Sequence, residues 1–401
     1  MSFGKESIRA PLPTRELDRR YLEIRKAMKA EGIDILVVQN DNMYLGGYVR
    51  YFLGIPAVNG YPVTVLFPYD DDMTTITHGG PPDRPGPPDF AVHHVKNKVC
   101  FPYFRTVRYT NKWDAEETVK IIKARGDKKV GVIGLGLMHA AFYTYVKEHL
   151  TGVEIVEATD MVDEIKAIKS ADELVYVRRA VETQDIVMAA VPFMLRPGRH
   201  EFEVRNDIIH MLADLGSEEQ LMRLGSAPNG EPAITAHNYY QNRKIDWGDQ
   251  VTIMVEPNGP GGYYGECART WVLGEPTQDL LKAWDDALAA QKYAAALSKP
   301  GVHVAEIFTK YNEFIVARGY TAEGRVFAHG QGYDLVERPL IRDDEDMTLK
   351  ADMVLAIHPL LVTSTAWAFP CDDFLVTAAG AERMHKTPSE VFAVGSEGRI
   401  F

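Results

Sequence analysis

The second half of the chain contains one pattern twice, and this repeat limits the possible fold more than any other feature. Residues 196–200 and 299–303 share a Pro-Gly-x-His turn, and each turn opens a helical pattern that ends at a glycine, Gly216 or Gly319. A turn, an amphipathic helix and a terminal glycine are the start and stop signals of a helix. Strand-like segments follow each helix. The sequence therefore predicts two copies of a helix-plus-strands unit around a shared sheet, related by a pseudo-two-fold axis.

The first half has a different hydrophobicity pattern, because apolar runs of strand length alternate there with amphipathic segments. Residues 33–38, 63–67 and 129–133 are typical of buried strands, and residues 15–31 and 138–150 are typical of helices. Strands that alternate with helices indicate an α/β domain. This pattern changes near residue 165, where a capping-box pattern at 170–173 opens a long helix. We expect two domains, 1–165 and 166–401.

Composition excludes several classes of partner. The 401 residues are 46% hydrophobic and carry a formal net charge of −12, which disfavours binding to nucleic acid or to an anionic membrane. No stretch approaches the roughly 20 apolar residues that a membrane span needs, and the N-terminus lacks an apolar signal core. Three cysteines cannot form a disulfide framework, so we expect a cytoplasmic protein.

Two histidines stand where short apolar runs end. Glycines flank His329, and Pro359 follows His358. Imidazole titrates near neutral pH and binds metals, so this pair points to chemistry, although two core histidines with satisfied hydrogen bonds would give the same pattern. Three further segments could converge with them, namely residues 235–239, a hairpin at 251–272 and another hairpin that begins at Cys371.

Four motifs carry a family resemblance. They are Gly248-Asp249 before a strand, Gly265-x-x-x-Arg269-Thr270, Ala328-His329-Gly330-x-Gly332 and Met353-Val354-x-x-Ile357-x-Pro359. With them the chain resembles the pita-bread family of methionine aminopeptidases, prolidases, aminopeptidase P and creatinase. The resemblance implies an α/β N-terminal domain of the creatinase and prolidase type. An α+β pita-bread domain with an internal pseudo-two-fold repeat would follow it. It also implies a small-molecule substrate and a homodimer.

The departures from this family concern the metal ligands. Peptidases of the family hold two divalent metals with two Asp, one His and two Glu. The matching positions here are Met254 or Val255, Glu266, His329, His358, and Cys371 or Asp372. Two neighbouring cations need several carboxylates to offset their charge, so we do not expect a dinuclear site. Two options stay open: one metal such as zinc, held by Glu266, His329, His358 and Cys371, or a metal-free site like that of creatinase, which we favour.

The resemblance also implies roles for individual residues. His237, like its counterpart in creatinase, would be the general acid and base. Glu266 would orient water or bind a cationic nitrogen, while His329 and His358 would polarise the scissile group. The substrate-binding residues of creatinase are not retained in the N-terminal domain, so the expected substrate contacts are different ones. They are Arg50, Tyr51, Tyr61, Glu337 and Cys371.

The expected function is therefore a creatinase-like hydrolase that cleaves a C–N bond in a small polar molecule. The bond could belong to an amide, an amidine or a compound derived from a lactam. Three alternatives remain: a lyase acting on a small zwitterion, an Xaa-Pro-type metallopeptidase with altered ligands, and a binding module without catalysis. The sequence does not name the substrate.

Overall fold

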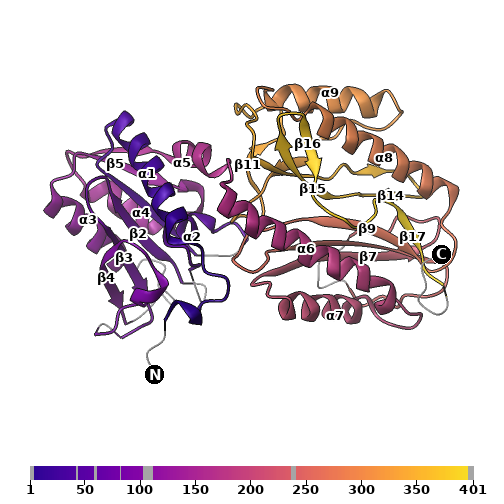
Figure 1. Cartoon of the computed structure of the whole chain (residues 1–401), viewed down its shortest axis with the longest axis horizontal. Coiled ribbons are helices and arrows are strands. Elements are labelled where there is room, and N and C mark those ends of the chain that lie inside the picture. Colours follow the sequence, from indigo (N-terminus) through magenta and orange to yellow (C-terminus); the bar gives the residue numbers. More distant parts are fainter. Residues whose placement is uncertain are drawn as a thin grey trace. The chain divides into compact units, whose positions relative to one another are not determined.

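The structure, a computed structural model, describes residues 4–41, 44–57, 61–81, 83–102, 112–235 and 241–395. The chain divides into two compact units, one ending at Lys166 and the other beginning at Ala167. Figure 1 shows the elements of both. None of the helices in the described ranges has the length and apolar character that crossing a bilayer requires.

The N-terminal unit is built on one six-stranded sheet with the strand order β4-β3-β2-β1-β5-β6. Its strands are β1 (Ile35–Asn40), β2 (Val63–Pro68), β3 (Met73–His78), β4 (Val95–Phe101), β5 (Lys129–Ile133) and β6 (Glu154–Glu157). Its helices are α1 (Thr14–Glu31), α2 (Gly47–Leu53), α3 (Trp113–Arg125), α4 (Ala140–His149) and α5 (Thr159–Lys166). Short 3-10 turns occupy η1 (Lys5–Ser7), η2 (Asp89–Ala91) and η3 (Leu135–Leu137).

Helices cover both faces of this sheet. Leu66 belongs to an apolar cluster that also contains Ile122 of α3 and Phe142 of α4. The next residue along β2, Phe67, points to the opposite face, where its ring lies 5.5 Å from the ring of Tyr21 in α1. Successive residues of a strand face opposite sides, so the sheet is buried between two helical layers. The predicted α/β class of this unit is confirmed.

The first strand begins two residues later than its apolar run predicts. The N–H of Ile33 bonds to the carbonyl of Met28, and that of Gly32 bonds to Lys29. Gly32 has φ +67, so the chain leaves helix α1 through a left-handed residue, which favours glycine. Ile33 therefore closes the helix end, and β1 starts only at Ile35.

The described part of the C-terminal unit contains two larger sheets, β17-β9-β8-β7 and β11-β10-β12-β15-β16. The strands of the first are β7 (Gln220–Pro228), β8 (Asp249–Pro257), β9 (Cys267–Val272) and β17 (Val391–Ala393). Those of the second are β10 (Ala328–Gly330), β11 (Glu337–Leu340), β12 (Val354–Ile357), β15 (Asp372–Thr377) and β16 (Gly380–Arg383). A small ribbon pairs β13 (Leu361–Val362) with β14 (Trp367–Ala368). The helices are α6 (Ala171–Met194), α7 (Glu201–Asp214), α8 (Gln278–Leu297) and α9 (Val304–Val316).

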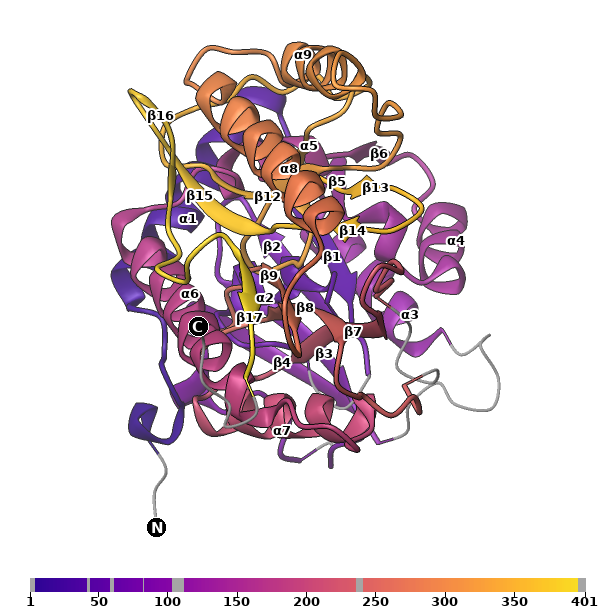
Figure 2. The ribbon, with the colours of Figure 1, turned by 90° about the vertical axis from the view of Figure 1, so that its right-hand side faces the viewer.

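Each sheet of this unit carries its own helix pair. Helices α6 and α7 pack together, with α7 against β7, whereas α8 packs with α9 and lies across β12 and β16 (Figures 1 and 2). Helix α6 begins with the predicted capping box, in which Ser170 and Glu173 bond to each other's backbone N–H. The α+β class of this unit is confirmed.

The predicted repeat is visible in individual hydrogen bonds. The N–H of Gly198 bonds to the carbonyl of Ile245 over 2.7 Å, and the N–H of Gly301 bonds to that of Leu349 over 2.8 Å. These glycines have φ of +89° and +88°. The two turns thus lead into equivalent helices, and each turn is hydrogen-bonded to a segment that precedes a strand. This correspondence is expected for a pseudo-two-fold repeat.

The two sheets of the unit meet through a backbone bridge between Ala268 of β9 and Cys371, the residue before β15. The N–H of each residue bonds to the carbonyl of the other, over 3.2 and 3.4 Å. The bridge brings the N-terminal ends of β9 and β15 together, and several of the predicted site residues lie at these ends.

Candidate active site

Four of the predicted site residues converge beside this bridge. Glu266 precedes β9, His329 lies in β10, His358 follows β12 and Cys371 precedes β15. The Nε2 atom of His329 lies 3.3 Å from Glu266 Oε1, and that of His358 lies 3.9 Å from Glu266 Oε2. The thiol of Cys371 donates to Glu266 Oε2 over 3.7 Å. All four residues are buried, so one carboxylate collects two imidazoles and a thiol away from solvent.

Strand pairing explains why the two histidines meet. Strands β10 and β12 are antiparallel neighbours in which Ala328 pairs with Ile357. His329 and His358 each follow one member of that pair, and their ring centroids lie 5.1 Å apart. Strands β10 and β12 are far apart in the sequence, but their pairing places both imidazole rings side by side.

A backbone bond fixes the orientation of the first imidazole. His329 Nδ1 donates to the carbonyl of Gly330 over 2.9 Å, which leaves Nε2 facing Glu266. Burial alone would lower the pKa of His329, but the charge of Glu266 and a hydrogen bond to it outweigh burial and raise this pKa. Burial likewise opposes the ionisation of Glu266, yet His329 and then His358 lower its pKa overall. Without a metal ion in the site, His329 and Glu266 therefore form an ion pair.

The second imidazole has the opposite character. Burial lowers the pKa of His358 to about 3, and Glu266 only partly offsets this. Burial raises the pKa of the Cys371 thiol well above its usual range, and the charge of Glu266 adds to the effect. The cluster thus combines one charged pair with a neutral imidazole and a neutral thiol.

Two more buried acids lie close to Glu266, and the sequence patterns did not select them as site residues. Burial and the charge of Glu266 raise the pKa of Glu256 to about 7, although Arg223 Nε lies 3.1 Å from it. Burial and Glu266 also raise the pKa of Asp373, whose carboxyl oxygens accept the N–H of Glu266. Like charges at short range cannot all ionise, so Glu266 is the acid that stays charged.

Gln331 is the clearest residue that sequence reasoning missed. Its side chain is fully buried two residues after His329, and neither of its amide atoms has a hydrogen-bond partner. After His329 and His358, Gln331 further lowers the pKa of Glu266, so its amide lies beside that carboxylate. His358 Nδ1 also makes no hydrogen bond. Buried polar atoms are rarely left without partners, so water or a polar ligand would complete this group.

The structure separates the alternatives that the sequence left open for two ligand positions. Met254 packs against Ala268, Phe369 and Cys371, whereas Val255 belongs to the apolar core on the other face of β8. Met254 therefore occupies the face that points toward Cys371.

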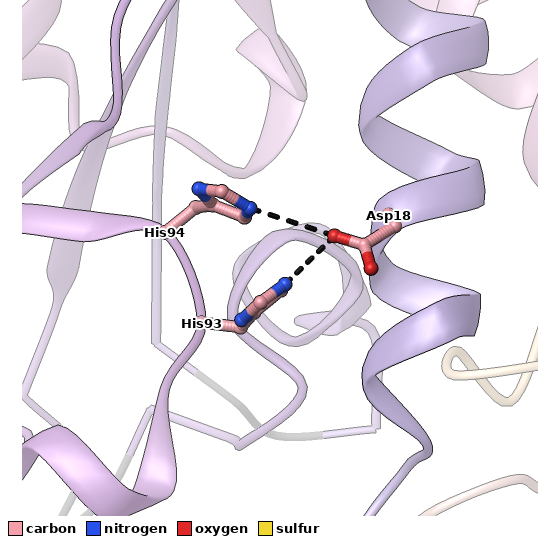
Figure 3. Close-up of side chains that lie close together, drawn as sticks. All are labelled: Asp18, His93 and His94. Atoms are coloured by element: carbon pink, nitrogen blue, oxygen red, sulfur yellow. Dashed lines mark hydrogen bonds and ion pairs between the residues drawn. The ribbon is translucent and has the colours of Figure 1, made fainter.

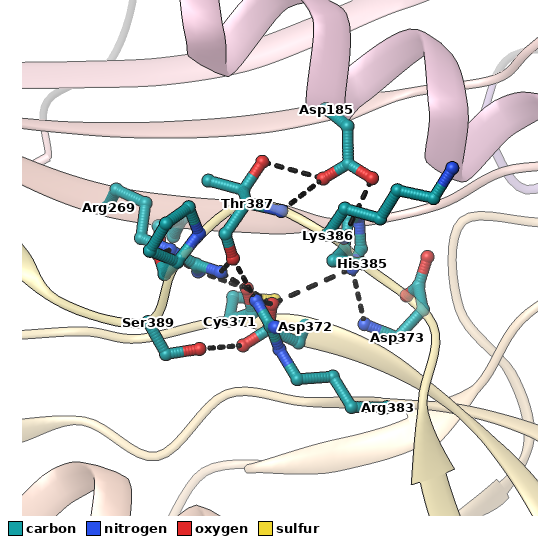
Figure 4. A network of polar contacts seen from close by, with 12 residues as sticks. Asp185, Arg269, Cys371, Asp372, Asp373, Arg383, His385, Lys386, Thr387 and Ser389 are labelled. Atoms are coloured by element: carbon teal, nitrogen blue, oxygen red, sulfur yellow. Dashed lines mark hydrogen bonds and ion pairs between the residues drawn. The ribbon is translucent and has the colours of Figure 1, made fainter.

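Asp372 lies in a polar network that includes two arginines (Figure 4). Arg269 and Arg383 each reach Asp372 Oδ1, over 2.6 and 2.8 Å. The nearby His385 accepts the N–H of Asp373 at Nδ1 and bonds Gln184 through Nε2. Asp372 is thus held by its own cations, and the position beside Glu266 belongs to Cys371.

The remaining predicted residues lie elsewhere or outside the described ranges. His237 is not among the described residues. Glu337 is buried in an ion pair with Lys169, whose Nζ lies 3.0 Å from Oε2. In the N-terminal unit, Arg50 and Tyr51 are buried in α2, and the Arg20 guanidinium lies over the Tyr51 ring at 4.3 Å. Tyr61 lines a cavity of about 430 Å³ in the same unit. Substrate contact by Arg50, Tyr51, Tyr61 or Glu337 stays a prediction.

The donor set fits one divalent cation. The ligand atoms of Glu266, His329 and His358 all lie within 4.8 Å of one another. Tetrahedral zinc with bonds of about 2.0–2.3 Å separates its ligands by about 3.3–3.8 Å, close to the spacings found here. The bond from His329 Nδ1 to a carbonyl is also the usual support of a metal-binding imidazole.

The same residues do not fit two bridged cations. Met254 brings a thioether within an apolar cluster to the position where a carboxylate would be needed. Of the other acids nearby, Glu256 pairs with Arg223 and Asp373 accepts the N–H of Glu266. The charge of two divalent ions would therefore rest on Glu266 alone among the converging side chains.

Comparison with known proteins assigns the chain to a family. Residues 20–168 match the creatinase/prolidase N-terminal domain, and residues 175–379 match metallopeptidase family M24. A probable dipeptidase PepE of Mycobacterium tuberculosis is 30% identical over 247 residues, which cover 61% of this chain and 65% of that relative. A creatinase of Bacillus sp. is 23% identical and aligns over 96% of this chain and 94% of its own length.

Solved structures agree on the fold. The crystal structure of dipeptidase PepE from Mycobacterium ulcerans covers 96% of this chain and 100% of its own, with 24% identity and a TM-score of 0.75. The predicted fold class and resemblance are thus confirmed. The chain belongs to metallopeptidase family M24 and carries a creatinase/prolidase N-terminal domain ahead of the family's own domain.

Proposed function

We propose that the chain is a hydrolase that cleaves a C–N bond in a small polar substrate at the cluster of Glu266, His329, His358 and Cys371. One observation carries this proposal. Polar atoms of His358 and Gln331 lie buried without hydrogen-bond partners beside the ion pair of Glu266 and His329, as expected where a polar substrate completes the site. The family supports the same reaction class, because relatives named dipeptidase and creatinase hydrolyse C–N bonds.

Each residue of the cluster has a role that its surroundings favour. The ionised Glu266 orients the attacking water or binds a cationic nitrogen of the substrate. The His329 imidazolium polarises the scissile group and holds the charge that develops on it, while His358 acts as a neutral partner. The water oxygen bonds to the carbon as the C–N bond breaks, and the proton of the water reaches the leaving nitrogen. We assign this transfer to His237, on the resemblance to creatinase.

The surroundings of the cluster favour a small substrate. His329, His358, Glu266 and Cys371 are at most 6% exposed, and Phe369 packs edge-on to His358 at 5.9 Å. Gln331 offers one donor and one acceptor function, suited to an amide or amidine group of the substrate. We propose that Gln331 selects for such a group.

A single divalent cation is a second form of the same proposal, and the ligand spacings favour it. Glu266, His329, His358 and Cys371 would hold the ion. When bound, it would polarise the scissile carbonyl as a Lewis acid. Because metal binding requires a Cys371 thiolate and a neutral His329, loading would release protons from both residues.

Substitution of Glu266 tests the proposal. The first measurement is turnover of a panel of small amides, amidines, lactam-derived compounds and dipeptides by the wild-type protein. Glu266→Gln should then lower kcat at least about 100-fold, since it removes the charge that orients the attacking water, and one preorganised electrostatic group is worth roughly 10² to 10³-fold. Gln331→Leu should mainly raise KM. Glu306→Gln, at an exposed carboxylate on α9, is the matched control and should leave both constants unchanged.

The outcomes separate the alternatives. Full activity of Glu266→Gln would refute the proposed site. A product that contains an alkene and no added water would identify a lyase. Loss of activity on chelation, restored by zinc at one ion per chain, would establish the single-cation form, whereas two ions per chain would establish a dinuclear peptidase. Activity that chelation leaves intact would establish the metal-free form.

A further inference from the structure

A second cluster of metal-binding side chains lies in the N-terminal unit, apart from the candidate active site. Asp18 lies on α1, and the adjacent residues His93 and His94 come just before β4 (Figure 3). The Nε2 atoms of both imidazoles point at one oxygen, Asp18 Oδ1, over 2.7 Å for His93 and 3.5 Å for His94. The three ligand atoms all lie within 4.8 Å of one another.

The surrounding residues fix the direction of the His94 ring and contact both rings. His94 Nδ1 is bonded to Asp72 Oδ1 over 2.7 Å, so its Nε2 is directed toward Asp18. The Tyr21 ring lies 6.3 Å from the ring of His93 and 6.1 Å from that of His94. A carboxylate behind a histidine is the usual outer support of a metal-binding imidazole, because it fixes the tautomer and the ring orientation. The ligands are therefore held by groups outside the cluster itself.

The charges in this cluster also suit a cation. His94 faces a carboxylate with each ring nitrogen, Asp72 on one side and Asp18 on the other. With neutral imidazoles, the two carboxylates supply two negative charges, which one divalent ion offsets. The neighbouring Asp71 takes no part, because Lys96 Nζ lies 2.9 Å from it.

We propose that Asp18, His93 and His94 bind one divalent transition cation, for which zinc is the fitting choice. Two imidazoles and one carboxylate suit zinc rather than magnesium or calcium, which prefer oxygen ligands alone. The side chains of Asp18 and His94 are 54% and 41% exposed, so water can complete the coordination. The ion links helix α1 to the segment before β4. The proposal is independent of the hydrolase reaction.

Zinc titration of the full-length protein tests this site. Chelator-treated wild type and variants are titrated with Zn²⁺ in a calorimeter, and the number of ions bound per chain is compared. Asp18→Asn and His93→Gln should each lose one zinc equivalent relative to wild type. Asp72→Asn should keep that equivalent but bind it about 10- to 100-fold more weakly, as expected for an outer support. Mg²⁺ should not compete.

Controls keep the result specific. His210→Gln alters an exposed His–Asp pair on α7 that lacks a third ligand, and it should bind zinc as wild type does. Glu266→Gln removes zinc only at the candidate active site, so the two sites are counted separately. Unchanged melting temperatures in chelator show that the variants fold. The proposal is overturned if wild type has no zinc equivalent beyond those lost in Glu266→Gln, or if Asp18→Asn binds zinc with wild-type stoichiometry and affinity.

Discussion

At the scale of single residues, the surroundings of Glu266 decide the character of the candidate site. Three acids are buried near one another, and the two imidazoles face only this one of them. Burial and then the charge of Glu266 raise the pKa of Glu256 to about 7 and that of Asp373 well above its usual range, whereas the pKa of Glu266 itself is lowered. A site of this kind is suited to proton transfer, because the acids next to Glu266 can take up or release a proton without leaving a buried charge unpaired.

His385 gives a pH-dependent prediction. It is fully buried and accepts a backbone N–H at Nδ1, so burial lowers its pKa to about 4. In the unfolded chain a histidine takes up its proton near pH 6.5. Between these values the unfolded state binds more protons, so the stability due to His385 is complete above about pH 6.5 and falls as the pH drops toward 4. The loss should reach about 3 kcal/mol.

The measurement is urea denaturation of the wild type and of His385→Gln between pH 4 and pH 7. The variant should be less stable at pH 7, because glutamine does not reproduce both hydrogen bonds of the ring. It should also lose less stability on acidification. His210→Gln, at an exposed histidine on α7, should keep the wild-type pH dependence. Equal slopes for His385→Gln and wild type would contradict the prediction.

At the scale of elements, the two matched turns of the repeat allow a paired test. Gly198 and Gly301 both have φ near +88°, and an added Cβ would meet no atom within 4 Å at either. Alanine there suffers only the backbone strain of a left-handed conformation, about 1–2 kcal/mol. Gly198→Ala and Gly301→Ala should therefore lower the free energy of unfolding by similar amounts.

The control for this pair is Gly324→Ala, since Gly324 has equal space around it and no left-handed φ. Denaturation midpoints of the three variants provide the comparison, and the double variant should show the sum of the single effects. A large loss of stability for one variant and none for the other would show that the two turns do not contribute equally to the stability of the fold.

The sequence predicts elements better than it predicts the directions of side chains. Terminal glycines, one capping box and apolar runs located α1, α4, α6, α7 and α9, because these signals act over a few neighbouring residues. They gave no prediction for α2, α3, α5 or α8. Whether Met254 or Val255 faces the site depends on strand register, which the pattern around them does not determine. Gln331 stayed hidden because a glutamine between glycines resembles a loop residue, whereas its importance comes from burial and from missing partners.

At the scale of the whole molecule, family membership leads to a prediction about assembly. In pita-bread enzymes the N-terminal domain of one subunit commonly closes the site of another, so we propose a homodimer. Light scattering after size exclusion should give twice the mass of one chain at micromolar concentration. A monomer that retains full specific activity would contradict the proposal. We also propose domains at 1–165 and 166–401, and the division into compact units after Lys166 supports this.

The bridge between Ala268 and Cys371 has a consequence for how the cluster is held together. It ties together the two sheets of the repeat, with Cys371 as one partner and Glu266 two residues before the other. The contact between the Cys371 thiol and the Glu266 carboxylate is therefore anchored by main-chain hydrogen bonds that join the two halves. A substitution that weakens this pairing would disturb the cluster without altering any of its side chains.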